Sequence, residues 1–315
     1  MNRKKFRYNG LSMRGAKTDD QSQTHAQYRW AIFFAILAAV LYAISMPMSK
    51  ILLRDVSPMM MAAFLYLGAG VGMLLFGLVR SHINLPDHEE RLERKDLPYT
   101  VAMVVLDIAA PIFLMFGLKT TAAANASLLN NFEIVATAVI ALLLFHEQVS
   151  RRLWLAIVLV TLACILLTVD DASSLSFSAG SLLVLSACIC WGLENNCTRC
   201  ISHKDPMEIV TVKGFGSGLG ALVIALSVGE SFPQWQYLPA VMVLGFVAYG
   251  MSIFFYTYAQ RTIGAAKTST FYAVAPFIGM LLSFIILGEK MTVIFIIALF
   301  IMLIGTYFAT FDKRG

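Results

Sequence analysis

Long apolar blocks separated by short polar connections dominate the chain from residue 30 onward. Each block approaches the roughly 20 mostly apolar residues that a helix needs to cross a bilayer. Ten such blocks cover residues 30–53, 60–79, 99–118, 124–145, 153–169, 180–200, 208–228, 237–259, 268–287 and 291–310. The pattern predicts an all-α integral membrane protein with ten transmembrane helices.

Composition and charge add an orientation to this picture. The chain is 58% hydrophobic and 14% charged, whereas a soluble domain carries about 25% charged residues. Residues 1–28 are basic and polar without the apolar core of a signal peptide, and we predict a disordered cytoplasmic tail. Most of the 24 Lys and Arg residues fall on the side of this tail when the spans alternate. By the positive-inside rule, both termini of this multi-pass protein are expected in the cytoplasm, with the spans in the cell (plasma or inner) membrane.

The two halves of the chain resemble each other. Residues 117–168 align without a gap with residues 259–310. The matched pairs include Thr120 with Thr262, Ser127 with Ser269, Glu147 with Glu289 and Thr168 with Thr310. Because each half has five helices, an odd number, the second half must be inverted relative to the first. We therefore predict two inverted five-helix repeats, 29–168 and 169–315, an arrangement typical of secondary transporters with a substrate site near the midplane. Chance similarity between apolar segments is the alternative.

Motifs in both halves resemble those of the drug/metabolite transporter superfamily, specifically the EamA-like permeases. Each half has a small-residue stretch entering a span (TTAAANAS, GAAKTST) and then an apolar run closing on a glutamate (LLLFHE, IILGE). An aromatic–small pair precedes a basic residue in the first and sixth spans (Tyr42-Ala43 to Lys50, Trp191-Gly192 to Arg199). The resemblance covers about residues 30–310. It implies ten helices, a central cavity, alternating access, and small metabolites, amino acids or drugs as substrates, often exported. It also implies structural roles at the helix ends for Glu147 and Glu289.

An acidic residue and two asparagines interrupt the fourth block, in LLNNFEIVATAV at residues 128–139. On a continuous helix, Asn130, Glu133 and Thr137 fall within about 60° on one face. An intramembrane carboxyl group costs about 2.5 kcal/mol or more on insertion and usually faces a cavity or a partner. We predict that Glu133, with Asn130 and Asn131, forms part of a substrate or proton site. A hydrogen-bond network that only holds helices together is the alternative.

The sixth block carries a second acidic group, in WGLENNCTRC. The resemblance implies that the first and sixth spans line the cavity, which adds Tyr42, Trp191, Glu194 and Asn195 as candidate lining residues. Two carboxylates with amide neighbours suit a cationic or amino-bearing ligand, because carboxylate and amide oxygens accept its hydrogen bonds. They equally suit proton antiport, because burial favours the neutral form of a carboxyl group. For Glu194, a buried ion pair without a ligand is the alternative.

Two further candidates follow from the alignment of the halves. Asp107 aligns with Tyr249, so both halves place a polar group in the middle of a span. Tyr272 takes the place of Asn130, and Ala275 takes the place of Glu133, so the acid at 133 belongs to one half only. The predicted substrate-binding set is Tyr42, Asp107, Asn130, Asn131, Glu133, Trp191, Glu194, Asn195 and Tyr272.

These observations predict a secondary transporter that moves a small organic metabolite, amine- or amino-acid-like, by alternating access. Proton coupling through the intramembrane acids is a second role that the sequence leaves open. KGFGSGLG (213–220) lies in an apolar block rather than after a strand, so we do not interpret it as a nucleotide loop. Its paired glycines predict close helix packing, at a moving face or in a homodimer. We expect no catalysis, cofactor, metal or nucleic acid, and as partners a small molecule, protons and lipid. An intramembrane enzyme using paired acids, and a receptor or scaffold, are the alternatives; inverted halves favour transport.

Overall fold

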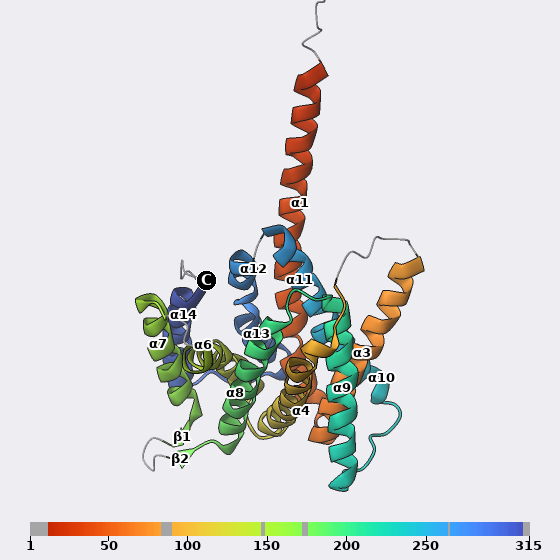
Figure 1. Cartoon of the computed structure of the whole chain (residues 1–315). Helices are drawn as coiled ribbons and strands as arrows, with labels where there is room; N and C mark the ends of the chain where they lie inside the picture. Colours follow the sequence, from red (N-terminus) through yellow and green to blue (C-terminus); the bar gives the residue numbers. More distant parts are fainter. Residues whose placement is uncertain (1–11, 83–89, 146–148, 172–175, 264, 311–315) are drawn as a thin grey trace, which may run out of the picture.

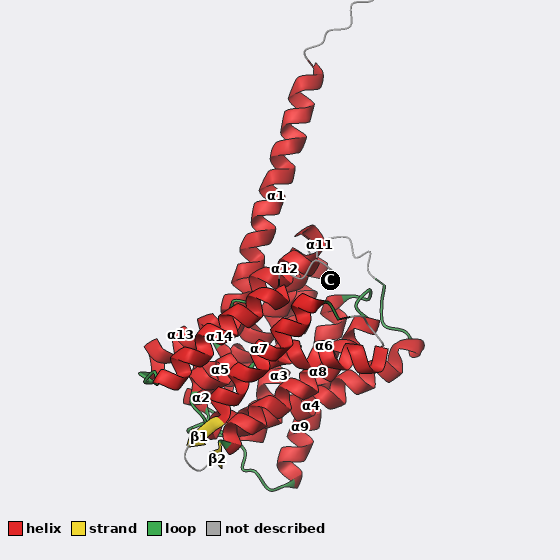
Figure 2. Cartoon of the chain, turned by 90° about the vertical axis from the view of Figure 1, so that its left-hand side faces the viewer, coloured by secondary structure: helices red, strands yellow, loops and turns green. Residues whose placement is uncertain are grey.

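The computed structural model describes residues 12–82, 90–145, 149–171, 176–263 and 265–310. Helices pack side by side into one bundle, from which the N-terminal part of α1 projects (Figure 1, Figure 2). The α-helices are α1 (Ser12–Ala43), α2 (Ser45–Leu52), α3 (Pro58–His82), α4 (Leu97–Thr120), α5 (Ala123–Leu129), α6 (Phe132–Phe145), α7 (Arg151–Thr168), α8 (Ala179–Cys200), α9 (Pro206–Ser227), α10 (Leu238–Gly245), α11 (Ser252–Ile263), α12 (Ala265–Tyr272), α13 (Ala275–Leu287) and α14 (Val293–Thr310). The remaining elements are the 3₁₀-helix η1 (Arg94–Asp96), the π-helix η2 (Phe246–Met251) and the antiparallel strands β1 (Val169–Asp171) and β2 (Ser176–Phe177).

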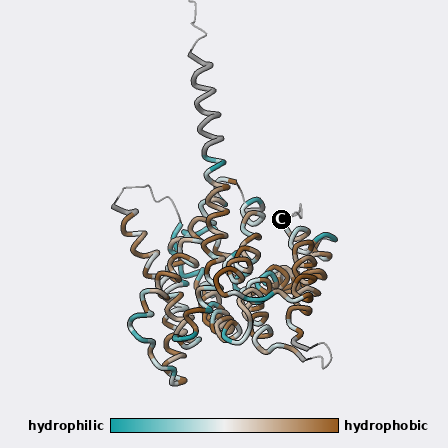
Figure 3. The backbone as a smooth tube through the Cα atoms, turned by 180° about the vertical axis from the view of Figure 1, so that it is seen from behind, coloured by the Kyte–Doolittle hydropathy of each residue, from teal (hydrophilic) through white to brown (hydrophobic). Residues whose placement is uncertain are grey.

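Within the described ranges, nine segments are long and apolar enough to cross a membrane. They coincide with the expected blocks except for block 180–200, which folds into α8. Glu194 and the two asparagines after it make α8 more polar than the other spans. Apolar residues dominate the bundle (Figure 3), and large side chains such as Ile285 (78% exposed) and Val293 (73% exposed) point outward. An outer surface of this kind is suited to contact with lipid. The predicted helical class is confirmed.

Two spans are interrupted at equivalent places in the two halves. The fourth block, expected as one helix, divides into α5 and α6 at residues 130–131, and the ninth block divides into α12 and α13 at 273–274. At the first break the backbone N–H groups of Asn131, Glu133 and Ile134 donate to carbonyls three residues back, each at 3.1 Å. The side chain of Asn131 also donates to Leu128 O at 3.1 Å. Asparagine side chains compete in this way with the regular helical pattern, which explains the interruption.

Helices from the two halves of the sequence pack against each other in four main pairs. α4 packs on α8 and α1 packs on α11, so the third span of each half contacts the first span of the other. α3 packs on α9, and α7 packs on α14. Glycines allow the α3–α9 contact to be close, because a Cβ added to Gly214 would lie 2.4 Å from Gly70 Cα. On the other face of α9, Gly216 and Gly220 meet side chains of α4. The predicted close packing of the glycines in residues 213–220 is confirmed, and it occurs within one chain.

Candidate functional site

A cavity of about 1120 Å³ lies at the centre of the bundle. Its walls come from both halves of the chain. The first half contributes α1, α3, α4 and α6, and the second half contributes α8, α9, η2, α11 and α12. Glu90, His203 and Lys204, in the connections after α3 and α8, also line it. These connections lie at the end of the bundle from which α1 projects (Figure 1). The cavity therefore reaches from the middle of the bundle to this end, which we call the open end.

Most of the predicted site residues line this cavity. They are Tyr42, Asp107, Glu133, Trp191, Glu194, Asn195 and Tyr272. Asn130 and Asn131 do not line it and are buried at the helix break. Asn130 Nδ2 donates to the hydroxyl of Tyr42 at 3.3 Å, and Asn131 Oδ1 accepts from Thr306 of α14 at 3.4 Å. The two asparagines shape the break that precedes Glu133 and hold neighbouring helices.

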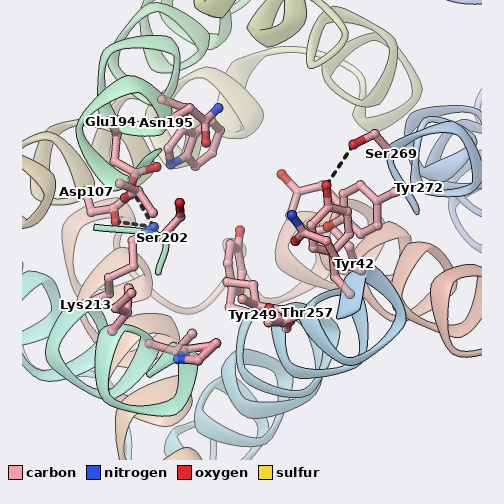
Figure 4. A pocket seen from close by; sticks show the side chains of 18 of the residues that line it. Tyr42, Asp107, Glu194, Asn195, Ser202, Lys213, Tyr249, Thr257, Ser269 and Tyr272 are labelled. Atoms are coloured by element: carbon pink, nitrogen blue, oxygen red, sulfur yellow. Dashed lines mark hydrogen bonds and ion pairs between the residues drawn. The ribbon is translucent and has the colours of Figure 1, made fainter. Parts of the chain in front are cut away.

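An ion cluster, defined as Asp107, Glu194 and Lys213, forms one wall of the cavity. Lys213 Nζ lies 3.1 Å from Asp107 Oδ2 and 2.8 Å from Glu194 Oε1. Dashed lines mark ion pairs of this cluster in Figure 4. The hydroxyl of Tyr66 donates to Asp107 Oδ1 at 3.1 Å, and that of Thr198 donates to Glu194. Asp107 is 1% exposed and Glu194 is 2% exposed. Buried charges require partners of this kind, so one lysine compensates two acids from α4 and α8.

Glu133 lies in the first turn of α6 and stands apart from this cluster. Asn195 Nδ2 donates to Glu133 Oε1 at 2.7 Å and to Thr137 Oγ1 at 3.3 Å. Among the side chains that the structure describes, none with a positive charge lies within ion-pair distance of Glu133. A carboxylate in the first turn of a helix is favoured by the helix dipole. Glu133 therefore presents an acceptor to the cavity without a cation to neutralise it.

Aromatic residues form the opposite wall. This tyrosine wall consists of Tyr42, Tyr249, Tyr256 and Tyr272 from α1, η2, α11 and α12. The ring centroid of Tyr42 lies 5.9 Å from the centroid of Tyr249 and 5.9 Å from that of Tyr272. The ring centroids of Tyr256 and Tyr272 are 5.0 Å apart. Figure 4 shows labelled members of this wall facing the ion cluster across open space. Tyrosine rings offer apolar faces to an organic body and attract cations.

The sequence-based prediction did not include Lys213. A lysine in an apolar span is an intramembrane ionisable group and indicates a functional site on that ground alone. Its position within residues 208–228 is visible in the sequence, but as a residue within or at the edge of a span it does not contribute to the orientation and was not assigned to the site. Tyr66 and Tyr256 had no comparable signal, because a tyrosine in a span is equally expected at a lipid-facing or core position.

The mouth of the cavity is held by a separate ionic knot. Lys204 Nζ lies 3.3 Å from Glu90 Oε2, 3.3 Å from Glu93 Oε1 and 3.6 Å from Asp96 Oδ2, and its side chain is fully buried. Hydrogen bonds from Lys95 and Lys204 hold the pKa of Glu93 below its usual range. Burial alone lowers the pKa of Lys204, but hydrogen bonds to Glu93 and Glu90 outweigh it, and the net pKa of Lys204 is raised. The knot ties the connection before α4 to the connection before α9.

Polar contacts join the helices at the other end of the bundle, which we call the closed end. Lys50 Nζ donates to three backbone oxygens at the C-terminal end of α4, at 2.6, 3.1 and 2.8 Å. Glu289 accepts from the first two backbone N–H groups of α5 at 2.7 and 2.8 Å. Glu230 accepts from the hydroxyl of Ser57 at 2.7 Å and from Met60 N at 3.0 Å. The structural role expected of Glu289 is confirmed, whereas Glu147 lies outside the described residues.

Comparisons with known proteins give a consistent result. The model of the EamA-like transporter family matches residues 29–169 and 178–311. A protein of Methanothermobacter thermautotrophicus named "Uncharacterized transporter" is 26% identical in an alignment that covers 88% of this chain and 85% of the relative. "Uncharacterized transporter YdfC" of Bacillus subtilis is 24% identical over 81% of this chain and 82% of its own length. A solved crystal structure superimposes with a TM-score of 0.64 at 16% identity, covering 90% of this chain and 99% of that chain, and supports the fold.

Proposed function

The chain belongs to the EamA-like transporter family, and from this premise we propose that it is a secondary transporter for a small organic metabolite, amine- or amino-acid-like. Membership indicates a multi-pass membrane transporter rather than an enzyme, and it implies a bilayer and a small-molecule substrate. The transported molecule binds in the central cavity between the ion cluster and the tyrosine wall. Alternating access requires a binding site between the two halves of the chain, and this cavity is lined by both halves.

The scaffold of this transporter consists of ten membrane helices in two inverted repeats, 29–168 and 169–315. Three observations support the arrangement: the fourth span of each half is broken within one residue of the same aligned position, α4–α8 and α1–α11 are equivalent contacts, and the family model matches the chain in two segments. Cysteines introduced at Ser202 and Gln236 test the orientation. We expect impermeant reagents to label residue 202 from the cytoplasm and residue 236 from outside, and labelling from one side would overturn the alternation.

The described conformation is one state of an alternating-access cycle. With both termini in the cytoplasm, the open end faces the cytoplasm, and the contacts of Lys50, Glu230 and Glu289 seal the outer end of the bundle. Transport then requires these contacts to break while the open end closes. The energy comes from a solute or proton gradient, and Glu133 and Glu194 are the groups that carry protons if protons are coupled.

The observation that carries this proposal is the unpaired carboxylate of Glu133 in the cavity. Glu133→Gln preserves shape and keeps an oxygen that accepts from Asn195, but it removes the charge. We expect substrate movement to fall by about tenfold or more, because losing one partner of a desolvated charge pair is costly. Asp55→Asn, an exposed carboxylate-to-amide change outside the cavity, is the matched control. Transport at the unsubstituted rate by the Glu133 variant, at equal expression, would contradict the site assignment.

A further inference from the structure

The basic side chains that line the described cavity are already paired with carboxylates. Deep in the cavity, Lys213 contacts both Asp107 and Glu194, and only 15% of its side chain is exposed. At the mouth, Lys204 is enclosed by the three carboxylates of the ionic knot. The imidazole of His203 lies 3.9 Å from one of the same carboxylates. A ligand entering from the open end thus meets positive charges that are neutralised.

The negative charges of the cavity are in excess. The ion cluster contains two carboxylates and one ammonium, and Glu133 adds a third carboxylate. Like charges in a poorly solvated cavity repel strongly, because the effective dielectric constant is low. A ligand carboxylate would be repelled by this wall and would have to break an existing ion pair to reach Lys213. A ligand ammonium, in contrast, finds the carboxylate of Glu133 together with the side-chain oxygens of Asn195 and Thr137.

The inference rests on the proposed transport function. We propose that the substrate is an organic amine without a carboxylate group, and that amino acids are excluded. Its ammonium binds Glu133, and its apolar or aromatic body lies against the tyrosine wall. Lys213 already supplies an ammonium to Asp107 and Glu194, so these two acids cannot bind a second ammonium of the ligand. Lys213 is therefore a specificity-determining residue that restricts the site to monoamines.

Matched pairs of amines and parent amino acids test the first part. The full chain, purified in detergent, is titrated with tyramine against tyrosine, phenethylamine against phenylalanine, and isoamylamine against leucine, and the shift in melting temperature is measured. We expect the amine of at least one pair to bind about tenfold or more tightly than its amino acid, since a carboxylate adds only repulsion here. Glu133→Gln should remove this preference, whereas Asp55→Asn should retain it. Equal or tighter binding of the amino acids, or no binding by any amine, would overturn the proposal.

Substitution of the resident lysine tests the second part. Lys213→Met leaves Asp107 and Glu194 without a cation, so the ratio of affinities for cadaverine over pentylamine should rise by about tenfold or more. Because two unpaired acids endanger folding, Lys213→Met combined with Asp107→Asn provides a second variant with one free carboxylate at Glu194. Lys213→Arg keeps the charge and should keep the preference for pentylamine. An unchanged ratio in both methionine variants would show that Lys213 does not set specificity.

These measurements separate the inference from the proposed function. Binding reports on the cavity in detergent and needs no movement across a membrane. If amines bind through Glu133 but are not transported in proteoliposomes, the inference stands and the transport proposal fails. If amino acids are both bound and transported in preference to amines, transport stands and the inference fails.

Discussion

The closed end offers a direct test of the proposed transport cycle through Glu289. Its carboxylate accepts from Ala123 N at 2.7 Å and from Ala124 N at 2.8 Å, and it thereby fastens the connection before α14 to the start of α5. Glu289→Gln keeps one acceptor oxygen and loses one charge-assisted bond. Such bonds contribute about 1.5–3 kcal/mol, and the lower end applies because Glu289 is partly exposed. A loss of about 1.4 kcal/mol from the sealed state increases opening about tenfold.

The assay is cysteine accessibility from the side opposite the termini. Ser49 in α2 is fully buried beside Lys50, so Ser49→Cys, in a chain without the five native cysteines, reports opening of the closed end. We expect the rate of labelling by an impermeant maleimide to rise about tenfold with Glu289→Gln. The control is Asp55→Asn, which removes a charge at the same end without breaking this contact. A labelling rate that stays constant or falls in the Glu289 variant would refute the assignment of this contact as part of the seal.

Two further predictions concern stability. Gly214→Ala should lower the melting temperature of the purified chain, because the added Cβ would lie 2.4 Å from the backbone of α3 and overpacking costs about 1–3 kcal/mol. Gly77→Ala is the control, because its Cβ would meet only the flexible end of a methionine side chain at 3.2 Å. Equal effects of the two substitutions would contradict the close packing of α3 and α9. In the ionic knot, hydrogen bonds from Lys95 and Lys204 hold the pKa of Glu93 below its ordinary 4.5. The contribution of these bonds to the stability of the folded chain is therefore complete above pH 4.5 and disappears as the pH falls through the lowered pKa. The melting-temperature difference between the unsubstituted chain and Lys204→Met should therefore be constant above about pH 5 and shrink below it, and a difference that grows in acid would refute this.

The pattern of long apolar blocks was sufficient to predict the helices, because a bilayer demands long apolar segments. It failed where a side chain competes with the backbone, as Asn131 does at the break before Glu133. It also could not reveal η2, because a π-helix adds one residue to a turn without changing apolar character. The acids of the cavity were visible from the cost of placing charge in a membrane. Their partners depend on which helices meet, and nothing in the local sequence pairs Lys213 with Asp107.

The two halves of the sequence differ in chemistry at aligned positions. The aligned partners of Asp107 and Glu133 are Tyr249 and Ala275, both neutral. The carboxylates lie on α4, α6 and α8, and both α4 and α6 pack on α8. In contrast, Tyr42, Tyr256 and Tyr272 lie on α1, α11 and α12, which form a second group of mutual contacts.

If each group moves as one body, and α9, which packs on α4, moves with the first group, the ion cluster remains intact through the proposed cycle while the distance between the carboxylates and the tyrosine wall changes. A molecule with an ammonium at one end and an apolar body then binds both walls best when they approach each other, in the occluded state. Such a ligand lowers the free energy of the occluded state relative to the two open states, and it thereby favours the conversion of one open state into the other. An amine too short to bridge the walls would bind Glu133 without this gain, so transport rates should rise with the length of the apolar body until it spans the cavity.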